Sequence, residues 1–366
     1  MQRAVRVRRL EAADHAAIMR VMDALSEVLG VIRLTGAVFL EMELRAQWSY
    51  LTAPARAIAD VLMPEAEHVI PYHLLLEGTC YARLLDGEFV ELSAGDLVMF
   101  SAGDRHVLAT ASDASLQIAP TEITGESLSF LKRNEIVPFK SGDKGSATRI
   151  ACGYLACDKR LAEPILLSMP RLLKLSMRDG STAAWLQSSI RFSIAQSMSG
   201  RPGSAMILAR LSEVLFAEAI RQHMDTLPPE ETGWLAALRD RYVGRALALI
   251  HEQPAYPWTV DALAHKVALS RSALGQRFTA LIGRPPMDYL LRWRILLAAR
   301  HLRESSAPII DIAAGVGYES EAAFNRAFKR EFGAPPAAWR RRAAQGTRTL
   351  IPAALRLNRP SPSACP

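Results

Sequence analysis

The stretch that decides the fold of the last third of this chain is DIAAGVGYESEAAFNRAFK, residues 311–329. A related stretch, VDALAHKVALSRSALGQRF, occupies residues 260–278. A shift of 50 positions aligns the two stretches, and the alignment continues into a shared glycine and a shared proline pair. The identities are Asp261 with Asp311, Ala264 with Ala314, Ser270 with Ser320, Phe278 with Phe328, Gly283 with Gly333, Pro285 with Pro335 and Pro286 with Pro336. One supersecondary unit therefore occurs twice.

The first copy predicts two short helices joined by a tight turn of small residues. The first helix covers residues 260–266, and Ser270 then stands where an N-cap residue belongs. A serine oxygen at that position accepts a hydrogen bond from a free backbone N–H of the first helical turn. Leu274 and Phe278 are four residues apart on the second helix, so we expect both on one buried face.

The second copy predicts the same motif. Gly315-Val316-Gly317 forms its turn, Ser320 is its N-cap, and Phe324 and Phe328 are expected to point into the core. The packing residues expected on the shorter helix are Ile310, Ala313 and Ala314. Small side chains at Ala264 and Ala314 would permit the close helix crossing of a helix-turn-helix.

A long helix over residues 287–304 is expected to connect the copies. Its apolar face carries Tyr289, Trp293, Leu296 and Leu297, and its basic residues are Arg292, Arg294, Arg300 and Arg303. A rigid connector holds two helices at a fixed distance, which suits B-DNA with major grooves about 34 Å apart on one face. We therefore predict a partner that is double-stranded DNA; the alternative is a helical repeat that serves packing alone.

The charge distribution agrees with this prediction. Residues 1–237 hold 24 Lys and Arg against 28 Asp and Glu, whereas residues 238–345 hold 17 against 9. A basic region attracts polyanions such as nucleic acid. A solvated basic surface without a partner is the alternative explanation of the same asymmetry.

A run of motifs in the second copy carries a family resemblance. These motifs are Asp311-Ile312-Ala313-Ala314, Gly315-x-Gly317-Tyr318, Ala323-Phe324-Asn325-Arg326-Ala327-Phe328-Lys329, Phe332-Gly333, Pro335-Pro336 and Trp339-Arg340. Through them, residues 240–342 resemble the DNA-binding domain of the AraC/XylS family of transcription regulators. The resemblance implies seven helices, two of which read successive major grooves.

Carried onto this chain, the resemblance implies DNA contacts from the second helix of each copy. The expected DNA-binding residues are Arg271, Ser272, Gly275, Gln276, Arg277, Glu321, Ala322, Ala323, Asn325, Arg326 and Lys329. Arginine can fork onto guanine and glutamine can pair with adenine, so Arg326 and Gln276 are the expected base readers, with phosphate contact as the alternative. Lys329 and Arg330 are expected to contact the phosphate backbone. Gly275 and Ala322 cannot hydrogen-bond through side chains, so some family contacts are expected to be missing.

The front of the chain has a β pattern. From about residue 36 to residue 120, short apolar runs alternate with turn residues. Residues 80–85 and 88–92 flank Asp86-Gly87, and this dipeptide between two such runs predicts a two-residue hairpin turn. The spacing predicts a small antiparallel barrel or jelly roll.

A cupin-like motif lies within this β region. Gly95-x5-Ser101-Ala102-Gly103-x2-His106 resembles the second cupin motif, with Ser101 in place of proline. Of the first motif only His73 and Glu77 fit, and Pro71 replaces the first histidine. His73, Glu77 and His106 are candidates for three metal ligands; alternatively, the histidines are packed barrel residues and Glu77 opens a turn. Because other ligand positions are replaced, we expect no metal and no cofactor.

The AraC/XylS resemblance extends loosely over the front of the chain. The matching residues are Asp23–Leu34, Gly36–Phe39, Trp48, His73, Gly78, Gly95–Val98 and Cys152–Tyr154. They resemble the cupin-type sensor domain of one branch of the family. This implies a small effector bound inside the barrel, and nothing in the spacing identifies the effector.

Beyond residue 150 the apolar period becomes helical. The segments Ile165–Leu166, Leu172–Leu175, Trp185–Ser197 and Ser204–Met224 carry this pattern. We expect these helices to cover the barrel or to pair with a second copy of the chain, which would make a homodimer.

The expected fold is therefore multidomain α+β. Its expected parts are a flexible arm (1–22), a cupin-like sensor barrel (23–150), a helical linker or dimerisation segment (151–235), an all-α double helix-turn-helix (236–342) and a disordered tail (343–366). No apolar run reaches the roughly 18 residues of a membrane span, and no signal peptide is recognisable. The four cysteines, Cys80, Cys152, Cys157 and Cys365, fit no disulfide framework, which predicts a reducing, cytoplasmic setting.

Two hypotheses about function follow. The first is a sequence-specific, DNA-binding transcriptional regulator that responds to a small effector and is not an enzyme. The alternative is a metal-dependent cupin enzyme with a DNA-binding appendage, whose catalysis would require the metal.

Overall fold

The computed structural model describes residues 24–32, 34–45, 47–64, 66–111, 119–124, 131, 135–178 and 180–348. It divides into two compact units, the first comprising Met1–Gly244 with Ala280–Gly283 and the second comprising Arg245–Thr279 with Arg284–Pro366. The expected arm over residues 1–22 lies outside the described residues. The division near residue 244 falls later in the chain than the domain boundary expected at 236.

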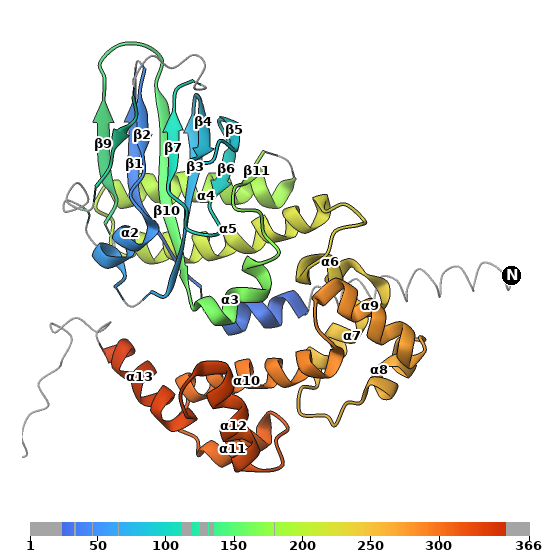
Figure 1. The fold of residues 1–366 in the computed structure, drawn as a ribbon. Coiled ribbons are helices and arrows are strands. Elements are labelled where there is room, and N and C mark those ends of the chain that lie inside the picture. Colours follow the sequence, from blue (N-terminus) through green and yellow to red (C-terminus); the bar gives the residue numbers. More distant parts are fainter. Residues whose placement is uncertain are drawn as a thin grey trace, which may run out of the picture. The chain divides into compact units, whose positions relative to one another are not determined.

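The first unit is built on two β-sheets (Figure 1). The six-stranded sheet has the order β11 (Leu173–Ser176), β6 (Asp96–Met99), β3 (His68–Glu77), β10 (Thr148–Cys157), β1 (Thr35–Leu44) and β9 (Val137–Ser141). The five-stranded sheet has the order β5 (Phe89–Ser93), β4 (Thr79–Leu84), β7 (His106–Ala109), β2 (Ser49–Leu51) and β8 (Thr121–Glu122). The expected β-rich front of the chain is confirmed.

The predicted hairpin is present between β4 and β5, which pair antiparallel from Thr79 with Ser93 to Arg83 with Phe89. The turn is one residue longer than expected, because the N–H of Leu84 donates to Glu88 O at 2.8 Å across three residues. Gly87 has φ +100°, a conformation that glycine adopts without strain.

Two expectations about the β region were wrong, and a third, antiparallel pairing, holds for most of the strand pairs. The expected boundary at residue 150 cuts through β10, a central strand that pairs with both β1 and β3. Residues 150–157 are buried on both sides of the sheet, so they lack the alternating pattern of a half-exposed strand. The segment Leu172–Leu175, interpreted as helical, contains strand β11; apolar runs this short do not separate the two periods. Finally, β8 and β9 join their sheets in parallel rather than antiparallel pairing.

Helices pack around the two sheets of the first unit. Those of the first unit are a segment over residues 24–32, α2 (Ala55–Leu62), α3 (Lys159–Leu166), α4 (Ser181–Met198), α5 (Ser204–Thr226) and α6 (Trp234–Arg239). Helix α5 packs across β1 and β10, and Tyr72 of β3 and Ser212 of α5 share a 2.6 Å hydrogen bond. Gly153 makes room for this contact, because a Cβ there would lie 2.1 Å from Cζ of Tyr72. The helices predicted over 185–197 and 204–224 are thus present.

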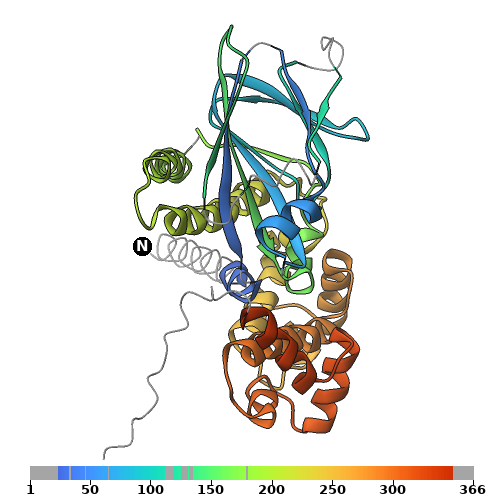
Figure 2. The same cartoon turned by 90° about the vertical axis from the view of Figure 1, so that its left-hand side faces the viewer.

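The second unit consists of helices, drawn from yellow-orange to red in Figure 2. From α7 onward they are α7 (Arg241–Glu252), α8 (Val260–Lys266), α9 (Arg271–Ile282), α10 (Pro286–Glu304), α11 (Ile309–Gly315), α12 (Glu321–Phe332) and α13 (Pro336–Arg348). Helix α7 enters this unit at residue 245, and α9 leaves it after Thr279. Seven helices match the expectation for the region. The disordered tail expected over 343–366 is wrong for residues 343–348, which belong to α13; residues 349–366 lie outside the described part.

No helix among the described residues has both the length and the apolar character that a membrane crossing demands.

Candidate functional site

The two helix-turn-helix copies hold their second helices in the same way. Ser270 Oγ accepts from the N–H of Ala273 at 3.2 Å, and Ser320 Oγ accepts from the N–H of Ala323 at 3.2 Å. The predicted core residues are fully buried on both helices: Leu274, Phe278, Phe324 and Phe328. Each serine cap therefore starts a helix whose apolar face is anchored within its first two turns.

The first helices of the two copies are related by 49 positions rather than 50. Leu269 N donates to Ala264 O at 3.0 Å, and the equivalent bond runs from Tyr318 N to Ala313 O at 2.9 Å. The left-handed residue of the turn is Ala268 in the first copy, with φ 59°, and Gly317 in the second, with φ 88°. The second turn is therefore one residue longer before the serine cap.

Because of this extra residue, the expectation that Ile310, Ala313 and Ala314 all pack into the core was wrong for Ile310 and Ala314. Ile312 and Ala313 are buried, whereas Ile310 is 57% exposed and Ala314 is also exposed. The small residues at the helix crossings are thus Ala264 and Ala313. A gapless alignment could not reveal the shift, because it brought Ala264 onto the neighbouring alanine of an Ala-Ala pair.

The expected DNA-binding residues lie on α9 and α12 away from the buried side chains. Exposed among them are Arg271, Ser272, Gln276, Arg277, Glu321, Ala322, Arg326 and Lys329; partly buried are Gly275, Ala323 and Asn325. The two helices show matching burial at nearly every position of this face. Each helix thus presents polar residues outside its buried stripe, but Arg277 and Ala323 lie on a different side of their helices from Gly275 and Asn325.

The basic residues of α10 do not form a free surface. Arg294 is buried to 9% exposure and donates to backbone carbonyls. Arg292 pairs with Glu331 at 3.0 Å, and Arg300 pairs with Glu304 at 3.1 Å. The Arg303 guanidinium lies 5.5 Å from the ring centre of Trp339. These arginines stabilise the second unit internally, which the count of positive charges could not show.

In the first unit, the two candidate histidines meet between the sheets. His73 comes from β3 and His106 from β7, and their Nε2 atoms are 2.7 Å apart. His106 also stacks on Phe100 with ring centres 3.5 Å apart. Both imidazoles are buried, at 5% and 1% exposure. The hydrogen bond between the two histidines joins the two sheets across the core.

The proton positions of this pair follow from its neighbours. His106 Nδ1 lies 2.9 Å from Asp104 O, and a carbonyl only accepts, so Nδ1 carries the hydrogen. Neutral His106 then accepts at Nε2 from the N–H of His73. His73 Nδ1 in turn accepts from the thiol of Cys152, 3.1 Å away. Sequence reasoning did not assign Cys152 this role, because β10 was not recognised as a strand beside β3.

Burial keeps the hydrogen-bonded side chains of Cys152, His73 and His106 uncharged. Desolvation, and then the charge of His106, hold the pKa of His73 well below its usual value. Desolvation also lowers the pKa of His106 to about 4. Burial raises the pKa of the Cys152 thiol, so the sulfur keeps its proton.

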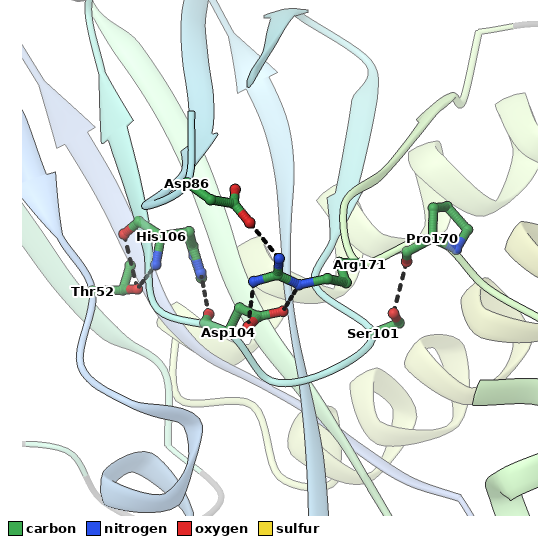
Figure 3. Close-up of polar contacts among 7 residues, drawn as sticks. All are labelled: Thr52, Asp86, Ser101, Asp104, His106, Pro170 and Arg171. Atoms are coloured by element: carbon green, nitrogen blue, oxygen red, sulfur yellow. Dashed lines mark hydrogen bonds and ion pairs between the residues drawn. The ribbon is translucent and has the colours of Figure 1, made fainter. Parts of the chain in front are cut away.

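The loop that positions His106 is held by polar contacts that the motif did not reveal (Figure 3). Thr52 Oγ1 donates to His106 O at 3.0 Å and accepts from His106 N at 3.1 Å. Arg171 donates to both carboxylate oxygens of Asp104, at 2.9 and 3.1 Å, and also pairs with Asp86. Ser101, which replaces the motif proline, donates to Pro170 O at 2.7 Å.

The three candidate metal ligands do not converge. Glu77 lies exposed at the end of β3, where it is opposite Arg149 of β10. His73 donates from Nε2 to Nε2 of His106, so the two nitrogens face one another instead of a shared point. Among the residues that the structure describes, no group of three or more His, Cys, Asp or Glu side chains is placed to hold a metal ion. This donor set does not fit a cupin metal centre.

A cleft of about 350 Å³ lies on the other face of the six-stranded sheet, under α4. Its lining includes Glu41 and Glu43 of β1, whereas Met42 between them contacts Cys152 at 3.6 Å on the inner face. Glu41 is buried and paired with Arg149. The cleft is therefore distinct from the interior around the histidine pair.

Comparison with known proteins now decides the family. Residues 23–225 match a family model described as Cupin, and residues 263–342 match one described as Helix-turn-helix domain. A putative AraC-like transcription regulator of Streptomyces lividans is 30% identical over 325 residues, covering 87% of this chain and 98% of that protein. The chain belongs to the AraC-like transcription regulators.

Two further relatives span nearly the same length of this AraC-like regulator. The HTH-type transcriptional regulator AlkR of Acinetobacter baylyi is 29% identical over 322 residues, 87% of this chain and 99% of its own. The RCS-specific HTH-type transcriptional activator RclR of Escherichia coli K12 is 27% identical over 325 residues, 88% of this chain and 99% of its own. The expected function, a DNA-binding transcriptional regulator, is confirmed.

The histidine pair of this AraC-like regulator makes its stability depend on pH. Below about pH 6.5 the unfolded chain binds protons at these histidines, whereas the folded chain does not bind one at His106 until about pH 4 and resists protonation of His73 as well, so stability falls as the pH falls. The loss approaches about 1.4 kcal/mol per pH unit for each group. Thermal unfolding of the full chain between pH 7.5 and pH 5 measures it.

The test variant is His106→Phe, which removes one of the buried histidines. The matched control is His301→Gln, which removes an exposed histidine. His106→Phe is expected to have a shallower pH dependence and His301→Gln to keep that of the original chain. Equal slopes in all three proteins would contradict the neutral, buried pair.

Proposed function

We propose that this regulator binds DNA by inserting α9 and α12 into successive major grooves. The observation that supports the proposal is the matching polar face of two serine-capped helices, each held by two buried side chains in the same second unit. A helix fits the major groove, and two contacts on one face of B-DNA are about 34 Å apart.

Base reading is assigned to Arg326 on α12 and Gln276 on α9. Both side chains are exposed on the polar face, and both can make two hydrogen bonds to a single base. Arg271 pairs with Asp261 at 3.2 Å across the first turn, so we assign it, with Lys329, to the phosphate backbone. Glu321, Ala322 and Ser272 would approach base edges at the start of each helix.

Arg326→Ala is expected to relax the sequence preference at one base pair, at a cost of about 1–3 kcal/mol for the preferred base. The measurement is binding of the full chain to DNA selected by it from a random pool, with each base pair then varied. Lys329→Ala, one turn further along α12, is the control; it should weaken all sequences alike and lower the salt slope by about 1. A uniform loss with Arg326→Ala would instead make Arg326 a phosphate contact.

We further propose that the first unit forms a cupin-like chamber that binds a small effector between its two sheets. Polar groups are concentrated there within an apolar core, in the chain from Cys152 through His73 to His106. Trp48 adds a buried indole N–H that has no hydrogen-bond acceptor among the described residues. A buried donor of this kind favours a ligand with an acceptor group.

A compound library screened against the full chain by thermal unfolding tests this location. An effector bound between the sheets should raise the unfolding midpoint, alter the affinity for the selected DNA, and lose both effects in His106→Phe. Arg149→Met, in the outer cleft, is the control and should leave both effects in place. Loss of binding in Arg149→Met with retention in His106→Phe would place the effector in the outer cleft instead.

The homodimer is proposed to form through α4 and α5. Trp185 and Phe192 are seven residues apart on α4 and are 58% and 62% exposed. Ile207 and Val214 are also seven residues apart, on α5, at 51% and 43% exposure. Apolar residues at this spacing on a helix surface are typical of a seam between helices, which favours a second copy of the same segment.

Replacing Phe192 and Val214 together by Asp is expected to convert a dimer into a monomer of about 40 kDa, read by light scattering with size-exclusion chromatography. Leu167→Asp is the control, because Leu167 is 80% exposed but lies at the end of α3. A monomeric original chain, or a dimer that survives the double replacement, would contradict this interface.

The relatives are regulators, and the donor set at His73, Glu77 and His106 does not support metal chemistry, so no enzymatic activity is proposed. The setting proposed for the regulator is the cytoplasm, where its three described cysteines, all buried, stay as thiols.

A further inference from the structure

Arg294 lies near the middle of α10, the helix that connects the two helix-turn-helix copies. Its guanidinium donates from three nitrogens: Nε to Pro254 O at 2.7 Å, Nη2 to Tyr256 O at 2.9 Å and Nη1 to Gly317 O at 3.0 Å. Pro254 and Tyr256 belong to the loop that leads into α8, the first helix of the first copy. Gly317 belongs to the turn of the second copy. Arg294 therefore joins the loop that precedes the first copy to the turn of the second copy.

Burying the charged guanidinium of Arg294 is unfavourable unless hydrogen bonds compensate for the lost water. Arg294 is 9% exposed, and burial lowers its pKa, but arginine stays charged in proteins. A buried charge is tolerated only when it is well hydrogen-bonded, and here its three acceptors are neutral carbonyl oxygens. Charge-assisted hydrogen bonds are about twice as strong as neutral ones. The carbonyls of the loop before α8 and of the second turn are thus fixed relative to a single rigid, planar group.

Gly317 makes this close approach possible. A Cβ at residue 317 would lie 2.8 Å from Cα of Ala255 and 2.9 Å from Cζ of Arg294, and its φ is +88°. The equivalent position of the first turn is Ala268, which carries a side chain at φ 59°. The difference shows that the second turn is packed against the loop and the guanidinium, where the first turn accommodates a methyl group.

We propose that Arg294 is a positioning residue that fixes the separation and angle of α9 and α12, and thereby the spacing of DNA contacts that the regulator accepts. The loop that it holds continues into Thr259, the N-cap of α8, whose side chain accepts from Ala262 N at 3.1 Å. The turn that it holds continues into Ser320 and α12. This inference rests on the proposed insertion of both helices into successive grooves.

The test compares three DNAs: one selected from a random pool by the full chain, and two derivatives with one base pair added or removed between its two contact blocks. One base pair rotates the second groove by about 35°, since a turn contains about 10–10.5 base pairs. The original chain should bind the derivatives about tenfold or more weakly, because its helices cannot follow. Arg294→Met should lose about threefold or less on the same change, whatever its affinity for the selected DNA.

Arg300→Met is the matched control, because Arg300 lies on the same helix and pairs with Glu304 in the next turn of that helix. It should keep the spacing preference of the original chain. Arg294→Lys keeps the positive charge but has fewer hydrogen-bond donors. Its spacing preference should therefore lie between that of the original chain and that of Arg294→Met. An Arg294→Met protein that is folded by circular dichroism and keeps the tenfold preference would overturn the proposal.

Gly317→Ala provides an independent route if Arg294→Met does not fold. It should relax the spacing preference by pushing the loop and guanidinium apart, while Ala268→Gly, at the equivalent position of the first turn, should not. An unchanged spacing preference in Gly317→Ala would overturn the proposed positioning role of Arg294. If the original chain selects no DNA at all, two-groove binding fails and the role of Arg294 fails with it; normal binding with identical spacing preference in every variant overturns Arg294 alone.

Discussion

The second unit depends on one packing constraint, the complete burial of two large side chains four residues apart behind a serine N-cap. Leu274 with Phe278 anchors α9, and Phe324 with Phe328 anchors α12. Because the anchored face of each helix is fixed, the remaining positions are forced outward, and the polar residues at these positions become a surface that a groove can accept. The proposed reading role of both helices rests on the way their apolar sides are buried.

Much of this region could be predicted from the sequence because its signals are local. An N-cap serine followed by apolar residues at helical spacing specifies a helix and its buried face within twelve residues. The extra residue in the second turn escaped detection, because adjacent alanines satisfied either register. The role of Arg294 was also invisible: its acceptors lie 40, 38 and 23 positions away in the chain, so the sequence shows only one more positive charge.

The β-rich unit was harder to predict for the opposite reason. Its central strand β10 is buried on both sides, so the apolar run beyond residue 150 has no alternation and resembles a buried helix segment. Only after β10 is placed beside β3 does Cys152 meet His73, and only after the sheets face each other does His73 meet His106. Long-range pairing thus creates a polar chain from residues that a cupin motif would assign to metal binding.

The most direct measurement of the proposed DNA contact is hydroxyl-radical footprinting of the full chain on DNA that it has selected. Two reading helices held at one helical repeat should protect two blocks centred about 10 base pairs apart on one face of the duplex. Protection of a single block, or of two blocks on opposite faces, would contradict simultaneous reading by α9 and α12.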